Sequence, residues 1–136
     1  MSSETLKPWG IAVIRVSLGV VLVVHSIYLK LFIYSLPGTA AFFASIGLPA
    51  VLGYVVFAIE AVAGIALILG WQTRAAALAV IPILLGATWA HWSAGWLFTN
   101  AGGGWEYPAL LSFLAIAQAL LGDGAFAVAR QSRLQS

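Results

Sequence analysis

Apolar residues follow one another in four long runs, and polar residues gather mostly between the runs. The run from Trp9 to Leu29 is interrupted only by Arg15, Ser17, His25 and Ser26. An α-helix needs about 20 mostly apolar residues to cross roughly 30 Å of hydrocarbon. The pattern therefore predicts an all-α fold, a bundle of four transmembrane helices. The expected helices cover residues 9–33, 49–70, 74–95 and 105–122.

Glycines mark where the runs end, at Gly70 and in the triple-glycine stretch 102–104. The uncharged connection 34–48 is too short to span a membrane, so we expect it to form a short interfacial helix between the first two spans. No part of the chain is left for a soluble domain. Residues 1–136 are therefore predicted to be one membrane domain, with a tail at 125–136.

Composition points the same way, because 62% of the residues are hydrophobic and only 7% are charged. A soluble globular domain carries about 25% charged residues. The net charge of +2 is small and dispersed, which excludes a nucleic-acid partner. The chain has no cysteine, which excludes disulfides and thiolate-held iron–sulfur clusters. The expected partners are membrane lipids and either another protein or a second copy of the chain.

Basic residues near the ends of the predicted helices indicate how the chain is oriented. Lys7, Arg74, Arg130 and Arg133 lie on one side of the membrane, and Lys30 lies on the other. Cytoplasmic loops carry the excess of lysine and arginine. The predicted topology therefore has both termini in the cytoplasm, N-in and C-in.

Ionisable residues inside the apolar runs are candidates for function, because each costs at least about 2.5 kcal/mol to place in hydrocarbon. Arg15 and Glu60 are the most deeply placed. At about 1.5 Å per helical residue, their backbone heights differ by roughly 6 Å, which two side chains can bridge. We expect them to form a structural ion pair, since two unpaired buried charges would be costly.

The segment 90–111 places a histidine, three tryptophans and a glutamate between two apolar runs. His25 and His91 lie at matching heights in the outer half of the predicted bundle, and Glu106 begins the last helix just above them. We expect these three residues, together with Glu60, to line a polar cavity and carry its chemistry. The alternative is that His91 and Glu106 reach out to interfacial water.

A quinone is the cofactor that this cavity suggests, because histidine beside carboxylate can hydrogen-bond a quinone carbonyl and move protons. Aromatic rings would wall such a headgroup. The residues expected to contact the cofactor are Arg15, Lys30, Trp92 and Trp105. Two histidines without local ligand spacing are a weak metal signal, so no metal is expected.

Several stretches resemble the DoxX family of small bacterial inner-membrane proteins, namely "RVSLGVVLVVHSIYLKLF", "GLPAVLGYVVFAIEAVAGIALILGWQTRAAAL" and "HWSAGWLF" with "GGGWEYPALL". The resemblance covers nearly the whole chain. It implies a four-helix protein of the inner membrane, related to the membrane subunit of a thiosulfate:quinone oxidoreductase. The family's polar C-terminal motif is incomplete here, since Gly122 and Gly124 match but Ala127 and Ala129 replace polar residues.

These features together predict an inner-membrane subunit that contributes to quinone-linked electron transfer, with a partner that delivers electrons. Catalysis by this chain alone is not expected. A first alternative is a non-enzymatic scaffold that binds partner helices through small-residue faces. A second is a carrier of small molecules or protons, in which Pro82 and the buried charges act as gating elements.

Overall fold

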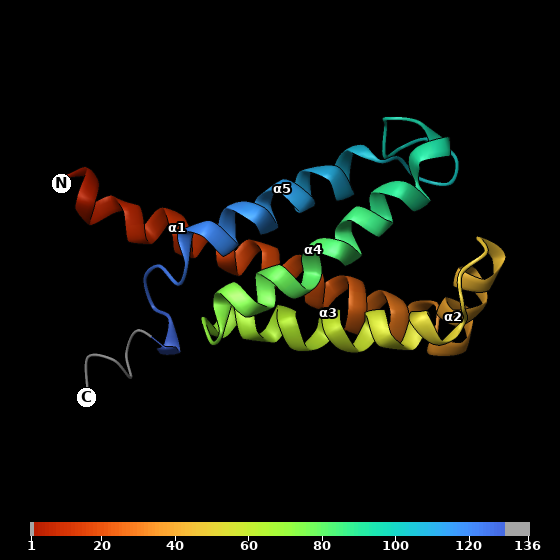
Figure 1. Ribbon diagram of the computed structural model, residues 1–136, viewed down its shortest axis with the longest axis horizontal. Coiled ribbons are helices and arrows are strands. Elements are labelled where there is room, and N and C mark those ends of the chain that lie inside the picture. The colour runs from red at the N-terminus through yellow and green to blue at the C-terminus, as the bar shows by residue number, and fades with distance from the viewer. Residues whose placement is uncertain (1, 130–136) are drawn as a thin grey trace.

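A computed structural model describes residues 2–129 of the chain, and within that range it is all-helical, with no strand. Figure 1 shows the arrangement. The helices are α1 (Ser3–Val23), η1 (Val24–Ile33), α2 (Leu36–Ser45), α3 (Val51–Leu69), α4 (Thr73–Ala90), η2 (Trp92–Ala94) and α5 (Glu106–Leu121). Arg130, Arg133 and most of the predicted tail lie outside the described residues.

The first helix starts earlier than predicted and changes its winding partway. The hydroxyl of Ser2 accepts a hydrogen bond from the Thr5 N–H, so this serine caps the start of α1. From Val24 onward the chain forms wider, π-type turns, and the Tyr34 N–H bonds the Leu29 carbonyl at 2.8 Å. Ser26, whose hydroxyl bonds the Leu22 carbonyl at 2.8 Å, lies where the winding changes. Such wide turns are rare and recur at functional sites.

The short helix predicted between the first two spans is present as α2. Ser35 caps it by accepting a hydrogen bond from the Gly38 N–H at 3.1 Å. Gly53, at the start of α3, lets α2 approach closely, because a Cβ there would lie 3.0 Å from the Ala40 backbone. This contact fixes α2 against the end of α3 that is nearest Lys30.

Within residues 2–129, three helices are long and apolar enough to cross a membrane, namely Ser3–Ile33, Val51–Leu69 and Thr73–Ala90. The shorter apolar helix Glu106–Leu121 accompanies them. Large apolar side chains such as Phe113 point outward, as expected for a surface in contact with lipid. α4 ends at Ala90 rather than at residue 95 as predicted, because the chain turns there into η2.

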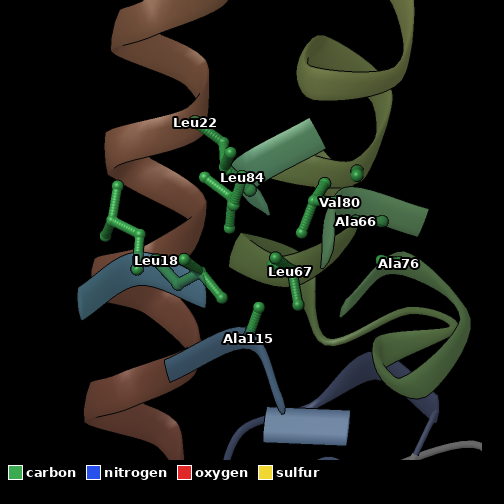
Figure 2. Packing of buried hydrophobic residues seen from close by; sticks show 10 residues of the cluster. Leu18, Leu22, Ala66, Leu67, Ala76, Val80, Leu84 and Ala115 are labelled. Carbon is green, nitrogen blue, oxygen red and sulfur yellow. The ribbon is translucent and has the colours of Figure 1, made fainter. Parts of the chain in front are cut away.

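The core lies where α1, α3, α4 and α5 meet (Figure 2). Leu18 and Leu22 of α1 face Leu67 of α3, while Val80 of α4 and Ala115 of α5 close the cluster from the other side. α1 packs mainly against α3, and α4 mainly against α5. The N-terminus and the α3–α4 turn lie toward one end, and α2 and the 91–105 connection toward the other (Figure 1).

Candidate functional site

A buried ion pair joins η1 to α3. The Lys30 Nζ atom lies 3.0 Å from Oε2 of Glu60, and only 7% of the glutamate side chain is exposed. α1 and α3 can approach because Gly19 and Gly64 face each other, and a Cβ on Gly19 would lie 2.7 Å from the Gly64 carbonyl oxygen. Helical side chains tilt toward the N-terminus of their helix, so Lys30 reaches back along η1 toward Glu60. The close glycine contact therefore fixes how α1 and η1 are positioned along α3, so that Lys30 can reach Glu60.

Arg15 does not pair with Glu60, so that sequence prediction is wrong. Its guanidinium is 1% exposed and donates hydrogen bonds to three backbone carbonyls, those of Leu67 at 2.9 Å, Ala125 at 3.0 Å and Asp123. Leu67 lies in the last turn of α3, where the carbonyls and the helix dipole favour a cation. Carbonyl groups, rather than the Glu60 carboxylate, accept the hydrogen bonds of this guanidinium, and Glu60 pairs with Lys30.

The Arg15 contacts also fasten the segment 122–127 against the helices. The Ala125 N–H bonds the Pro8 carbonyl at 2.9 Å, and Ala127 is fully buried. Gly70 leaves the space for it, since a Cβ there would lie 2.5 Å from the Cα of Ala127. Arg15 thus has an anchoring contact, and its predicted role in a cofactor site stays a prediction.

His25 lies on η1, near Tyr107 of α5. Its Nδ1 is 2.8 Å from the Val21 carbonyl oxygen. A carbonyl can only accept, so Nδ1 carries the proton and Nε2 of the neutral ring is an acceptor. The imidazole lies 6.2 Å, centroid to centroid, from the ring of Tyr107. Tyr107, which adjoins Glu106, was not singled out from the sequence, because tyrosine is common at the ends of membrane helices.

The connection between α4 and α5 is folded on itself. His91 uses Nδ1 to bond the Gly102 carbonyl at 3.1 Å, and Glu106 Oε1 accepts a hydrogen bond from the Phe98 N–H at 3.1 Å. Trp105 stacks on Trp92 with ring centroids 4.5 Å apart, and Trp96 meets Trp105 edge-on at the same distance. Every predicted site residue of this stretch therefore has a contact within the connection itself.

The predicted site residues thus fall into two groups and two separate residues. Lys30 and Glu60 form the ion pair, and the stretch 91–106 holds His91, Trp92, Trp105 and Glu106. Arg15 lies apart at the segment 122–127, and His25 lies on the same helix as Lys30 and contacts Tyr107, the residue after Glu106. Within residues 2–129 no three His, Cys, Asp or Glu side chains are grouped so that they could hold a metal ion. A single cavity shared by His25, Glu60, His91 and Glu106 stays a prediction.

Long apolar helices around buried charges define the class, an all-helical membrane protein. Residues 10–92 match the model of the DoxX family, more than half of the chain, so the chain belongs to the DoxX family. It is 37% identical over 78 residues to the protein named "Putative oxidoreductase CatD" of Bacillus subtilis (strain 168). The alignment covers 57% of this chain and 56% of that relative, so the chain spans little more than half of the relative's length. No solved structure matches the chain.

Proposed function

We propose that this protein is a subunit of the bacterial inner membrane that contributes to quinone-linked electron transfer together with a partner protein. The observation that carries the proposal is the Lys30–Glu60 pair, because buried charges within membrane helices are costly and usually functional. Membership in the DoxX family and the relative named as an oxidoreductase support it. The chain has no cysteine to carry electrons, so the partner would hold the electron donor.

In this proposal α5 also crosses the membrane, which gives four spans with both termini in the cytoplasm. Its 16 residues are about 24 Å long, and a bilayer accommodates a helix shorter than its hydrocarbon thickness by local thinning. The starts of α1, which carries Lys7, and of α4, which carries Arg74, lie at the same end of the bundle. η1, which carries Lys30, continues α1 toward the opposite end. The positive-inside rule then places the Lys7 end in the cytoplasm.

The residues around the ion pair suit a quinone headgroup. The Lys30 ammonium can donate to a carbonyl oxygen, and Nε2 of His25 can accept from a hydroxyl. The Tyr107 ring offers an aromatic wall beside His25. A bound quinone would supply two-electron, two-proton chemistry, and the Glu60 carboxylate would hold a proton near it.

The folded α4–α5 connection would serve as the outer cover of this region. His91 keeps Nε2 and Glu106 keeps Oε2 for exchange of protons with the outer water, because each uses its other polar atom within the connection. The stacked rings of Trp92 and Trp105 would limit access of water. Tyr107 connects this cover to His25.

Quinone titration of the purified protein in lipid nanodiscs tests the proposal. A short-chain naphthoquinone is added, and binding is followed by difference spectroscopy for the wild type, His91→Ala and the double variant Lys30→Met/Glu60→Met. We expect the double variant to bind about tenfold more weakly, the loss of one charged hydrogen bond. The matched control is Glu4→Gln/Lys7→Met, which removes an exposed ion pair of 2.6 Å on the same helix. Absence of saturable binding by the wild type would refute the proposal.

The second candidate function is a scaffold for partner helices, and one observation favours it. Gly86 is exposed on α4, and a Cβ there would meet no atom within 4 Å. Another helix could therefore approach this face closely. A Gly86→Leu variant that loses a copurifying protein but keeps quinone binding would favour the scaffold.

A further inference from the structure

Two adjoining hollows lie where α3 ends and α4 begins. The first, of about 580 Å³, is an apolar groove between α3 and α4. Its wall includes the exposed residues Ala58, Val62, Trp71, Ala75 and Ala79. Because these lining residues are exposed on the outside of the bundle, the groove faces the surrounding lipid. Its volume lies in the range of sites that bind small ligands.

The second hollow, of about 670 Å³, is about half polar and continues from the first at the beginning of α4. The two share the lining residues Trp71, Gln72 and Ala75. Thr73 and Arg74 add polar groups to the second hollow only. An apolar groove and a polar hollow therefore meet at one helix end, which suits a molecule with an apolar chain and a polar head.

The start of α4 lacks the acceptors that helix starts normally have. No side chain caps this 18-residue helix, and no acidic residue lies in its first turn. Thr73 is 1% exposed, and its hydroxyl has no hydrogen-bond partner within residues 2–129. The free N–H groups and the positive end of the helix dipole favour an anion at this position.

Positive charge prevails at the polar hollow as well as at the start of α4. Arg74 forms no ion pair with any of residues 2–129, and its guanidinium lies over Gly122, where a Cβ would be 3.1 Å from Nη2. Asp123 also lines the hollow, and its carboxylate attracts the guanidinium of Arg15, which hydrogen-bonds the Asp123 carbonyl. Two cationic side chains, Arg15 and Arg74, and the positive end of the α4 dipole therefore outweigh the one carboxylate.

We propose that an anionic phospholipid binds here, with its phosphate at the start of α4 and one acyl chain in the groove between α3 and α4. Arg74 and the first N–H groups of α4 bind phosphate oxygens, and the Thr73 hydroxyl gains an acceptor. The exposed alanines leave room for the chain beside Trp71. The polar hollow lies at the α3–α4 turn, whereas Lys30 lies in η1 and Glu60 in the middle of α3. The lipid site does not depend on the quinone proposal.

Native mass spectrometry of the detergent-purified chain with added phosphatidylglycerol or phosphatidylcholine tests this proposal. We expect phosphatidylglycerol to be preferred, and Arg74→Gln to weaken its binding about tenfold, as for one charged hydrogen bond. Lys7→Gln removes one exposed charge from the same end and is the matched control. Ala79→Trp fills the groove, keeps Arg74, and should weaken the lipid to a similar extent.

Three results would overturn the proposal. Equal effects of Arg74→Gln and Lys7→Gln would mean that general surface charge attracts the lipid. Full binding by Ala79→Trp would mean that no chain lies in the groove, and displacement of the lipid by millimolar glycerol phosphate would assign the site to a free phosphate. Ala79→Trp also keeps the test decisive if Arg74→Gln does not fold.

Discussion

Breaking the Lys30–Glu60 pair from one side should destabilise the protein far more than removing both charges. At the Nζ–Oε2 distance of 3.0 Å, the attraction is about 5 kcal/mol for an effective dielectric constant of about 20. Removing the two charges from water costs a free energy of similar size. The intact pair therefore adds little net stability compared with two apolar side chains. Lys30→Met, however, leaves Glu60 charged and almost fully buried, which costs about 3–5 kcal/mol.

The two single variants should differ. In Glu60→Met, the lysine is 19% exposed and flexible, so it can turn its ammonium outward to water and recover part of its hydration. In Lys30→Met, the carboxylate has a short side chain in the middle of α3 and cannot do so. We therefore expect the order of stability to be double variant, then Glu60→Met, then Lys30→Met.

Reversible unfolding in mixed detergent and dodecyl sulfate micelles, followed by circular dichroism, measures these differences. The double variant Lys30→Met/Glu60→Met should be at least about 2 kcal/mol more stable than Lys30→Met alone, by the same reasoning on unpaired charges. The exposed pair Glu4–Lys7 provides the control cycle, with a coupling below about 1 kcal/mol. A double variant no more stable than Lys30→Met would refute the reasoning.

Further variants test the anchoring contact, the helix contact and the aromatic stack. A lysine in place of Arg15 cannot make all three carbonyl hydrogen bonds, so Arg15→Lys should lower the free energy of unfolding by about 2–4 kcal/mol. It should also speed hydrogen exchange at the Ala125 N–H, and unchanged exchange would contradict the anchoring role. Gly19→Ala should lower the free energy of unfolding by about 1–3 kcal/mol in the same assay, because Gly19 lies against Gly64 of α3. The control Gly86→Ala should be neutral or stabilising, and equal effects of the two variants would refute the close contact of α1 with α3. Trp105→Ala should lower near-ultraviolet circular dichroism and cost at least about 1 kcal/mol, and an unaltered spectrum would argue against the stack.

Helix type and approximate position could be predicted from the sequence, because long apolar runs have few alternatives in a bilayer. The short helix at Leu36–Ser45 could be predicted too, since an uncharged segment of that length cannot span. The end of α4 was misplaced because Trp92 and Ala94 continue the apolar pattern after the helix has ended at Ala90. Composition cannot distinguish a helix from an apolar turn.

The groups that bind the buried charges could not be predicted from the heights of residues along the helices alone. A rise of about 1.5 Å per residue holds for an α-helix, whereas the π-type turns of η1 advance less per residue and bring Lys30 closer to Glu60. Moreover, Arg15 hydrogen-bonds no side chain of residues 2–129 but the backbone carbonyls of Leu67 and Ala125. Backbone acceptors from a distant segment leave no trace in residue type.

The distance along the chain between Arg15 and its carbonyl partners has a consequence for biosynthesis. Asp123 and Ala125 follow Arg15 by 108 and 110 residues, so the first helix leaves the ribosome long before these acceptors exist. An unpaired arginine costs about 2.5–3.5 kcal/mol at the centre of an inserting helix and less toward its ends. Arg15 lies at the level of the last turn of α3, where part of this cost remains. The first helix should therefore remain near the translocation channel or the membrane surface, and settle in its final place only when the last helix has been made.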